Sequence, residues 1–389
     1  MPVYLVGGPV RDVLLGALIK DLDFVLEGDI PALARALAGE LGGEVVTHAS
    51  FGTATIVLGD SRVDVVTARR ESYPHPGALP QVSAGTIGDD LARRDFSINA
   101  LAIPFFEERP ELIDQHGGLG DLGSGLVRIL HSRSFIDDPT RILRAVRYEQ
   151  RFGFHIEPDT EARLRNALSE GYMDTVSGDR LRHELERILE EEDPLPVLTR
   201  AIELGVLAAV HPSLKNSDAL RKLQALPYAA GGRYPRVNPM THLAALAYHL
   251  SPFDGEGLIS RLNLPNSWAR VVRDTIELRR REAELSAGSL SGSQIYYLIE
   301  GLSEEAVLAV SHLTESTLVG QRLEEFLNYL TEVRPQLNGQ DLLEMGVPFG
   351  PQVGRILRQL QQARLDRRVK TEKDERRLVR EILGGEGGN

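Results

Sequence analysis

The sequence has 389 residues, of which 42% are hydrophobic, and this length accommodates roughly two to four folded modules. No apolar run is long enough to cross a bilayer, and the absence of cysteine excludes disulfides and thiolate–metal sites and fits a reducing cytosol. The net charge of −12, from 56 acidic and 44 basic residues, argues against a generally cationic nucleic-acid-binding coat, so any RNA contact must come from a local basic face. Because the first motif already begins at residue 7, we expect no secretory leader and a cytoplasmic location.

The chain opens with a strand, a glycine pair and a helix. Residues 3–6 are an apolar run, followed by Gly7, Gly8 and then apolar residues at helical spacing. Glycines let the backbone approach an anion closely, and a helix N-terminus directs unpaired N–H groups at it. Arg11, in the first helical turn, can add a bidentate contact to phosphate. A Gly-Gly turn alone is as often structural as functional, but this arrangement predicts a phosphate-binding loop.

A second strand, expected over residues 21–26, carries the candidate catalytic carboxylates. Asp21 and Asp23 are two residues apart, so their side chains leave the strand from the same face. Two carboxylates beside a phosphate site are hard oxygen ligands suited to Mg²⁺. An isolated Asp-x-Asp could be the solvent face of a strand, whereas the combination with the glycine loop predicts a metal site on Asp21 and Asp23.

The rest of the first 125 residues mixes strands and helices. We expect a helix over 30–41, strands over Gly43–Val46, Thr53–Leu58 and Arg62–Val66, a helix over 89–102 and a short turn over 117–122. Asp64 is either a third metal carboxylate or an exposed strand residue. Residues 69–88 contain three prolines and three glycines with little periodicity, which predicts a long functional loop. Arg93 and Arg94 on the 89–102 helix could be a solvated face or part of the site.

From about residue 127 the strand signal vanishes, so the fold class is an α+β N-terminal region, a mixed sheet with helices, followed by an all-α region. The expected helices cover 137–151, 158–169 and 178–191, then 195–330 with breaks at 226–239, 251–257 and 286–292, and finally 352–383 after a short element at Leu342–Met345. No internal repeat is evident.

The 137–151 helix is expected to start with Asp137 or Asp138 as its N-cap and Pro139 in its first turn. Asp138, Arg141, Arg144 and Arg147 recur every three residues and form a slowly winding polar strip, with apolar residues largely on the other side. An ordinary basic helix face is one interpretation. The other is a ligand site, because three arginines in one strip repel each other unless something anionic lies across them.

Four blocks carry a family resemblance: YLVGGPVRDVLLG, DLD, RRDFSINA and DPTRILRAVRY. Together they resemble the class II tRNA nucleotidyltransferases (CCA-adding enzymes) and bacterial poly(A) polymerases, within the polymerase-β-like nucleotidyltransferase superfamily. These blocks lie in the first 155 or so residues; beyond them the likeness consists of helical character and the segment GPQVGRILRQLQQARLD. The sequence has Asp137 where the family often has Glu, which keeps the charge.

The resemblance implies a domain organisation and a reaction. The implied domains are a nucleotidyltransferase head at 1–126, a base-reading neck at 127–194, a tRNA-binding body at 195–330 and a tRNA-binding tail at 331–389. The implied reaction adds CCA to the tRNA 3′ end from CTP and ATP, with Mg²⁺ on Asp21 and Asp23 and release of pyrophosphate. Gly8, Arg11 and Arg94 would hold the triphosphate, while Arg144 and Arg147 would lie near the phosphates and sugar.

The same resemblance gives Asp138 and Arg141 the role of reading the base. Cytosine and adenine both present an exocyclic amine beside an unprotonated ring nitrogen, so a carboxylate can accept from the amine while a guanidinium donates to the ring. Guanine and uracil present the opposite pattern. One Asp/Arg pair can therefore accept C and A and reject G and U without a nucleic-acid template.

Three alternatives to full CCA addition stay open. An enzyme that adds only the terminal A, or only CC, is the nearest; residues 69–88 stand where CC-only enzymes have a shortened loop, which disfavours CC-only addition. Poly(A) polymerases usually carry an extended basic tail, and this chain is acidic. A non-catalytic RNA-binding protein is opposed by the joint presence of Asp21, Asp23, Arg94, Asp138 and Arg141. The cations Arg364, Arg367, Arg368, Lys370 and Lys373 are either tRNA contacts or a solvated face, and the oligomeric state is open.

Overall fold

The computed structural model describes residues 2–18, 22–28, 35–36, 38–40, 42–48, 53–58, 61–215, 219–220 and 238–386. The chain forms two compact units, Met1–Lys215 and Asn216–Asn389. None of the helices in the described ranges is both long and apolar enough to span a membrane. The division into head, neck, body and tail remains a prediction.

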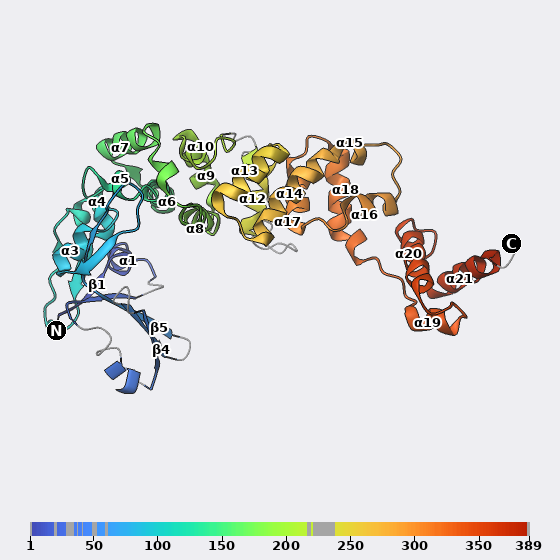
Figure 1. The fold of residues 1–389 in the computed structure, drawn as a ribbon, viewed down its shortest axis with the longest axis horizontal. Helices are drawn as coiled ribbons and strands as arrows, with labels where there is room; N and C mark the ends of the chain where they lie inside the picture. Colours follow the sequence, from blue (N-terminus) through green and yellow to red (C-terminus); the bar gives the residue numbers. More distant parts are fainter. Residues whose placement is uncertain are drawn as a thin grey trace. The chain divides into compact units, whose positions relative to one another are not determined.

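The first unit contains a mixed sheet of seven described strands in the order β3-β4-β5-β2-β1-β8-β9 (Figure 1). Its strands are β1 (Val3–Val6), β2 (Asp23–Leu26), β3 (Glu44–His48), β4 (Thr53–Leu58), β5 (Ser61–Thr67), β8 (Leu101–Pro104) and β9 (Ile113–Asp114). β1 pairs antiparallel with β2 and β8, whereas β2 and β5 are parallel. The expected strands are confirmed within the described residues, and five buried residues, three of them on β1, β2 and β8, form a core cluster: Val6, Val25, Ala68, Leu91 and Ala102.

Two further elements of this unit were not expected in this form. Residues 69–88 are not one loop, because β6 (Arg69–Ser72) and β7 (Gln81–Ala84) pair as an antiparallel hairpin. α4 (Gly118–Ser124) replaces the expected turn, since the Asp114 carboxylate accepts from the Gly118 and Leu119 amides and starts a helix. Within 30–41, residues 35–36 and 38–40 are helical, and the rest of that range lies outside the described residues.

The expected helix over 89–102 is wrong beyond its first turn. α3 (Ile87–Ala92) ends early, one 3-10 turn follows at Ser97–Asn99, and β8 then begins. Phe96, Ile98, Ala100 and Ala102 are all fully buried. Ser97, Asn99 and Leu101 between them are buried as well, so this segment has no solvent-exposed face of the kind that an amphipathic helix shows.

The helix expected over 137–151 is also interrupted. α5 (Ser134–Asp137) ends at Asp138, and α6 (Arg141–Phe152) begins after Thr140. Asp138 has the extended dihedrals φ −134° and ψ 92°, because a residue before proline is pushed out of the α region. Asp138 therefore lies between two helices rather than on the face that carries Arg141.

The remaining helices of the first unit follow α6 in the chain. They are α7 (Pro158–Ser169), the 3-10 turn η3 (Tyr172–Thr175), α8 (Gly178–Leu189), α9 (Pro194–Glu203) and α10 (Val206–Val210), with a short parallel pair formed by β10 (Leu126–Val127) and β11 (His155–Ile156). α6 packs against both α8 and α9. α6 buries Ile142, Leu143, Ala145 and Val146 completely. The polar side chains of α6 lie beside α8, where Arg144 and Arg147 both approach Glu184.

The described part of the second unit is helical, as expected. Its helices are α12 (Pro239–Ala247), α13 (Pro252–Leu262), α14 (Asn266–Arg280), α15 (Glu282–Leu285), α16 (Gly292–Ile299), α17 (Glu304–Leu313), α18 (Thr317–Asn328) and the 3-10 turn η4 (Leu330–Glu332). The expected break at 286–292 is confirmed, and most of 226–239 lies outside the described residues. The break at 251–257 is wrong, because Ser251 caps α13 by accepting from the Asp254 amide and Pro252 fits its first turn.

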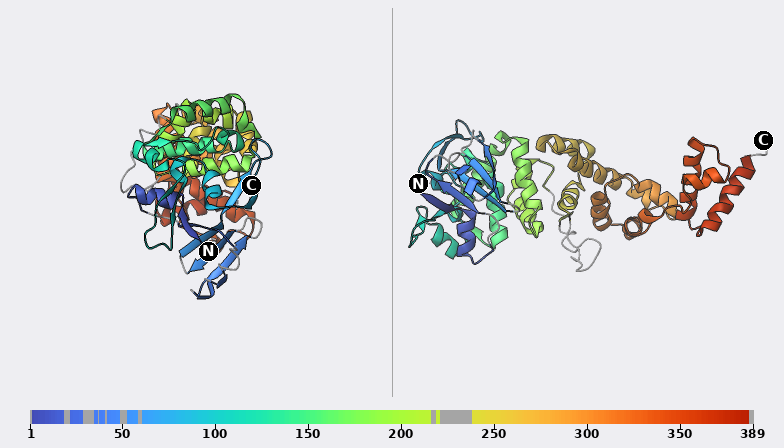
Figure 2. Two further views of the ribbon diagram at one scale, coloured as in Figure 1. Left: turned by 90° about the vertical axis from the view of Figure 1, so that its left-hand side faces the viewer. Right: turned by 90° about the horizontal axis from the view of Figure 1, so that it is seen from below.

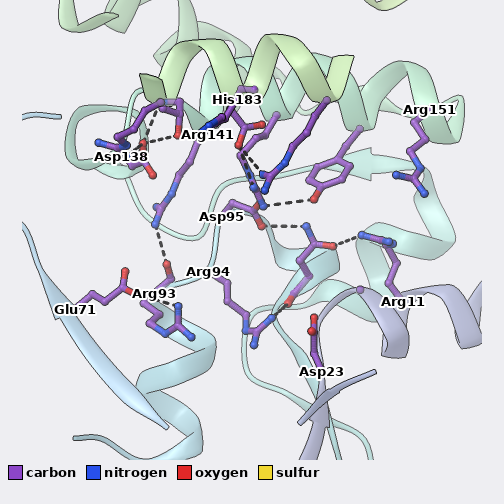
Figure 3. A pocket seen from close by; sticks show the side chains of 18 of the residues that line it. Arg11, Asp23, Glu71, Arg93, Arg94, Asp95, Asp138, Arg141, Arg151 and His183 are labelled. Carbon is purple, nitrogen blue, oxygen red and sulfur yellow. Dashed lines mark hydrogen bonds and ion pairs between the residues drawn. The ribbon is translucent and has the colours of Figure 1, made fainter. Parts of the chain in front are cut away.

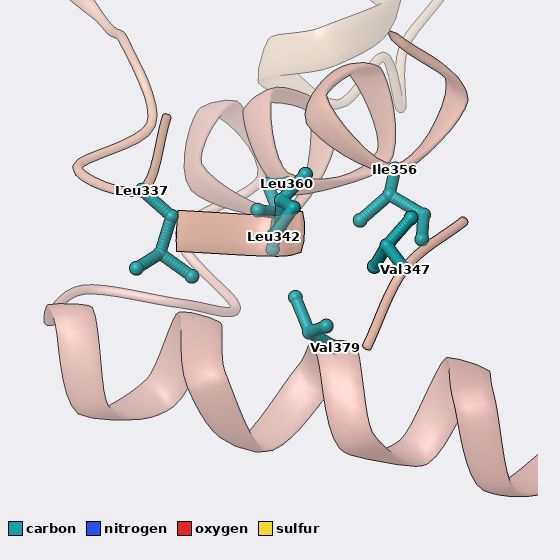
Figure 4. Close-up of a cluster of buried hydrophobic side chains, with 6 residues drawn as sticks. All are labelled: Leu337, Leu342, Val347, Ile356, Leu360 and Val379. Atoms are coloured by element: carbon teal, nitrogen blue, oxygen red, sulfur yellow. The ribbon is translucent and has the colours of Figure 1, made fainter. Parts of the chain in front are cut away.

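The last helices are α19 (Gly339–Glu344), α20 (Pro351–Leu365) and α21 (Glu372–Glu386), drawn in red in Figure 2. They enclose a cluster of buried side chains shown in Figure 4: Leu337, Leu342, Val347, Ile356, Leu360 and Val379. The single helix expected over 352–383 is wrong, since Arg367 adopts a left-handed φ of 58° and Thr371 caps a new helix with Asp374. The pattern T-x-x-D at 371–374 is a capping box and could have revealed this start.

Candidate active site

A cavity of about 550 Å³ in the first unit gathers side chains from the strand–loop–helix at the N-terminus, from the α3–β8 segment and from α6 and α8. Its volume falls within the range usual for small-molecule sites. Figure 3 shows Asp23, Arg94 and Arg11 on one side and Asp138, Arg141 and His183 on the other. The lining residues are Gly8, Arg11, Asp23, Glu71, Tyr73, Arg93, Arg94, Asp95, Asn99, Asp138, Thr140, Arg141, Arg144, Tyr148, Arg151, Arg180, His183, Glu184 and Arg187.

The glycine pair forms one edge of this cavity. Gly7 has a left-handed φ of 71°, and α1 (Gly8–Leu14) starts directly after it. This φ favours glycine, and a Cβ atom on Gly7 would overlap Nη1 of Arg94 and force that guanidinium to move. Arg94 in turn donates to the fully buried Asp90 carboxylate at 3.0 Å and to the Asn99 carbonyl at 3.4 Å. The loop and Arg94 are therefore held against each other.

Arg11 is 5% exposed, and its guanidinium has partners on three sides. Asp12 accepts from Nε and Nη2, and the Asn99 side chain accepts from Nη1 at 2.5 Å. The guanidinium carbon lies 4.6 Å from the centroid of the Phe152 ring. Arg11 is thus a fixed cation at the cavity wall rather than a flexible one.

Of the two predicted metal carboxylates, Asp23 is exposed at the start of β2 and lines the cavity, while Asp21 lies outside the described residues. Asp64 on β5 pairs in register with Asp23, so the two backbones are neighbours in the sheet. A third carboxylate at this position thus stays a prediction. Within the described ranges, no group of three or more His, Cys, Asp or Glu side chains is arranged to hold a metal ion.

Asp138 and Arg141 both line the cavity, but each is engaged by other residues. Asp138 Oδ1 accepts from Arg180 at 2.6 Å and from the Thr140 amide and hydroxyl. Oδ2 of Asp138 takes no hydrogen bond from the described residues, so it can accept a further donor. Arg141 donates to the Ser134 hydroxyl and to the Arg93 carbonyl, which uses two of its five N–H groups.

The arginine strip of α6 is neutralised by the protein itself. Arg144 donates to Asp95 at 2.5 and 2.8 Å and lies 3.5 Å from Glu184. Burial raises the pKa of Asp95, but Arg144 and the Asn99 amide outweigh it and lower the pKa to about 2. Arg147 pairs with Glu191 and Glu184, and it is not among the residues that line the cavity. The mutual repulsion of these arginines therefore needs no ligand to relieve it.

Sequence reasoning missed two parts of the cavity. Arg180, His183 and Arg187 come from α8, where their spacing of three and four residues puts them on one helix face. Glu71 and Tyr73 come from the hairpin that was expected to be a loop. Burial, followed by the nearby Glu71 carboxylate, raises the pKa of Tyr73 to about 12 against the opposing effect of Arg141, so the hydroxyl stays protonated and donates to Glu71.

Comparison with known proteins gives the same picture. Residues 3–128 match the family described as "Poly A polymerase head domain", and residues 153–217 match "Probable RNA and SrmB- binding site of polymerase A". The chain is 36% identical to the A-adding tRNA nucleotidyltransferase of Geobacter sulfurreducens over 97% of its own length, and 35% identical to the CC-adding tRNA nucleotidyltransferase of Deinococcus radiodurans over 98%. It spans 45% of the Geobacter protein and 89% of the Deinococcus protein.

A solved structure of a CCA-adding enzyme in its apo form has a TM-score of 0.83 and 33% sequence identity, covering 99% of this chain and 92% of that one. This likeness confirms the fold class of a mixed α/β head followed by helices. With a relative of 35% identity matched over most of both chains, the chain belongs to the tRNA nucleotidyltransferases, a family of enzymes.

Proposed function

We propose that this protein extends the 3′ end of tRNA with CCA, using CTP and ATP and releasing pyrophosphate. The observation that carries the proposal is that a single cavity is lined by a strand carboxylate, by a glycine loop with two fixed arginines, and by an Asp/Arg pair on the opposite side. These are the three parts that untemplated nucleotidyl transfer needs.

In this proposal the cations beside the glycine loop bind the triphosphate. Arg11 and Arg94 are already oriented by Asn99, Asp12 and Asp90, so little side-chain entropy is lost when phosphate binds. The Gly8 amide, at the start of α1, adds a neutral donor to the same oxygens. Holding the α-phosphate in line with the attacking hydroxyl is the main contribution of these residues.

Asp138 and Arg141 would read the base. Oδ2 of Asp138 would accept from the exocyclic amine of cytosine or adenine, and the remaining N–H groups of Arg141 would donate to the ring nitrogen. Arg180 and Thr140 hold Oδ1, which fixes the direction of the second oxygen. Arg144 would lie nearer the sugar and phosphates. Arg147, which is 7% exposed and paired with glutamates, would act by supporting α6.

We assign the metal site to Asp21 and Asp23, and the ion to Mg²⁺. The Asp23 carboxylate lies in the cavity together with Gly8 and Arg94, and hard oxygen donors of this kind fit a small divalent cation. Bound Mg²⁺ would lower the pKa of the tRNA 3′-hydroxyl and stabilise charge on the phosphates. The helical neck, body and tail would hold the tRNA, and the cysteine-free chain would work in the cytoplasm.

Addition of the terminal A alone is the second candidate, because the Geobacter relative that matches 97% of this chain is named an A-adding enzyme. The deciding assay gives the purified protein three tRNAs, which end at the discriminator, at C and at CC, with each nucleotide supplied singly. A CCA-adding enzyme extends all three, with CTP on the first two and ATP on the third. Extension of only the CC-ended tRNA identifies the A-adding activity, and extension of none removes the proposal.

A further inference from the structure

We infer that Asn99 is a positioning residue of the nucleotide site, whose side-chain amide holds the Arg11 guanidinium in the orientation that binds phosphate. The inference rests on the proposed function, because it assigns Arg11 to the triphosphate. It concerns a residue of the RRDFSINA block that touches neither Asp23 nor Asp138 through any hydrogen bond among the described residues.

The Asn99 side chain connects two charged groups. Its Oδ1 accepts from Arg11 Nη1 at 2.5 Å, and its Nδ2 donates to Asp95 Oδ1 at 3.0 Å. Asn99 is 6% exposed, so neither bond competes with bulk water. Arg11 and Asn99 are 88 positions apart, and their contact joins α1 to the segment before β8.

The orientation of this amide is unique. A guanidinium only donates and an ionised carboxylate only accepts, so the oxygen must face Arg11 and the nitrogen must face Asp95. Asp95 remains ionised because Arg144 donates to its other oxygen through two N–H groups. An amide of this length is the side chain that can satisfy both neighbours; alanine satisfies neither.

The other contacts of Arg11 do not fix the guanidinium in the same way. Asp12 is its sequence neighbour and binds Nε and Nη2, which would be possible over a range of side-chain torsions. The Phe152 ring supports one face of the guanidinium plane but sets no direction within it. The bond to Asn99 supplies that direction, since it ties Nη1 to a buried point. The Asn99 backbone carbonyl also accepts from Arg94, the second cation of the phosphate side.

If Asn99 acts through Arg11, its loss should weaken the hold on phosphate and leave the base unaffected. We expect Asn99→Ala to raise KM for CTP and for ATP by the same factor, about tenfold, as for removal of a hydrogen bond to a charged group. The inhibition constant of inorganic tripolyphosphate, which has no base, should rise by that factor as well. KM for tRNA should stay within about twofold of wild type, since Arg11 contacts no tRNA in this proposal.

A double-mutant cycle separates positioning from a structural role. Arg11→Ala, Asn99→Ala and the double variant are compared with wild type for the KM of CTP and the tripolyphosphate inhibition constant, with thermal unfolding measured in parallel. We expect the double variant to match Arg11→Ala, because Asn99 has nothing left to orient. Additive effects of the two substitutions would overturn the inference. Asn99→Gln, which keeps both polar ends on a longer chain, should recover part of the loss.

Two controls complete the test. Asn166→Ala removes an exposed amide of α7 outside the cavity and should behave as wild type. If Asn99→Ala unfolds below the assay temperature, Asn99→Ser replaces it, because serine also lacks the amide that joins Arg11 to Asp95. An unchanged KM for CTP in a folded Asn99→Ser variant overturns the inference. A wild-type protein that adds no nucleotide to any tRNA removes the proposed function, whereas an active wild type with unaffected Asn99 variants removes only the inference.

Discussion

The cations of the cavity are oriented by carboxylates that belong to the protein. Arg144 is held by Asp95 and Arg94 by Asp90, while Arg11 pairs with its neighbour Asp12 and is directed by the Asn99 amide. The lining nevertheless contains eight arginines against five aspartates and glutamates, and with Asp12 and Asp90 added a surplus of one positive charge remains, which favours an anion. Fixed cations cost little reorganisation when a charged ligand arrives, which favours electrostatic stabilisation of a transition state.

Asp23 is the carboxylate on which the metal assignment can be tested directly. Asp23→Ala should reduce nucleotide incorporation at least about a hundredfold, because metal binding supplies several kcal/mol of charge stabilisation. Filter binding should show that the affinity for tRNA is kept. Asp159→Ala, which removes an exposed carboxylate of α7, serves as the matched control. Turnover within about tenfold of wild type in the Asp21→Ala, Asp23→Ala double variant would contradict the two-carboxylate assignment.

Asp138→Ala tests base reading. Loss of its free oxygen removes the acceptor for the exocyclic amine, while the donors of Arg141 suit the carbonyl oxygens of UTP and GTP as well. A specific base contact is worth about 1–3 kcal/mol, so the CTP/UTP preference should narrow by roughly ten- to a hundredfold. The measurement is kcat/KM for all four nucleotides on tRNAs ending at the discriminator and at CC. An equal fall for all four would mean that Asp138 only organises the turn before α6.

The lowered pKa of Asp95 predicts that the free energy of unfolding depends on pH. Its pKa is lowered from 3.8 to about 2, so its contribution to folding is complete above the ordinary pKa and is lost as pH falls through the folded value. The difference in unfolding free energy between wild type and Asp95→Asn should be constant from pH 8 to 6. It should shrink by about 1 kcal/mol by pH 3. Urea unfolding at each pH measures it, and a difference that is independent of pH down to 3 would contradict the ionised pair.

Among the elements, the tip of the β6–β7 hairpin forms hydrogen bonds with α5 and α8. The Gly77 amide donates to the Ile136 carbonyl, and the Gly77 carbonyl accepts from Arg180 at 2.8 Å. Gly77 has a φ of 69°, and a Cβ there would overlap Thr175 Oγ1. Because Arg180 also binds Asp138, the position of the hairpin and the position of the base-reading carboxylate are linked.

Gly77→Ala should therefore displace the hairpin tip, at a cost of about 1–3 kcal/mol of local strain. We expect the rate of adding the terminal A to a CC-ended tRNA to fall several-fold more than the rate of adding C. In a variant shortened between Pro74 and Pro80, the rate of adding A should fall further still relative to the rate of adding C. Gly123→Ala, where a Cβ meets no atom within 4 Å, is the control and should leave both steps unchanged. An unchanged rate of adding A in the shortened variant would mean that the hairpin only connects its neighbouring elements.

The elements also explain what the sequence could predict. Strands β1, β4 and β5 follow directly from apolar runs, and the glycine pair and Arg11 were recognisable because their chemistry is local in the chain. Arg94 was assigned only through the family resemblance of the RRDFSINA block. The mistakes fall where a local signal was overridden or overlooked: proline at 139 breaks the helix that the arginine spacing suggested, and an Asx-type turn at Asp138 replaces an N-cap. Partners such as Asp90, Asn99 and Arg180 depend on contacts between distant segments, which no single pattern reveals.

At the scale of the whole chain, a net charge of −12 requires tRNA to be held by local groups of cations. In the last helices the arginines first considered for this role are largely engaged: Arg364 pairs with the fully buried Glu375, Arg367 with Glu325 and Arg368 with Asp366. Exposed cations that form no ion pair with another described residue are Arg355, Arg358, Lys370, Lys373 and Arg380. Ion pairs within the protein therefore account for the first group, and phosphate contact stays a prediction for the second.

The two groups of tail cations should behave oppositely on substitution. Replacing Arg355, Arg358 and Lys373 with Gln should weaken tRNA binding and reduce the slope of log K against log salt by roughly one unit for each phosphate contact that the substitutions remove. The folded tail should be unaffected, because these side chains are exposed.

Arg364→Gln leaves the Glu375 carboxylate buried without its cation, which typically costs about 3–5 kcal/mol. That carboxylate also accepts hydrogen bonds from the Gln336 and Leu337 amides, which lead into α19. We therefore expect Arg364→Gln to lower the unfolding temperature of the tail. Below that temperature, the slope of log K against log salt should not change. Binding titrations from 50 to about 300 mM salt, with thermal unfolding of each variant, separate the two effects. A slope that falls with Arg364→Gln and stays constant in the triple variant would reverse the assignment and make the paired arginines the tRNA contacts.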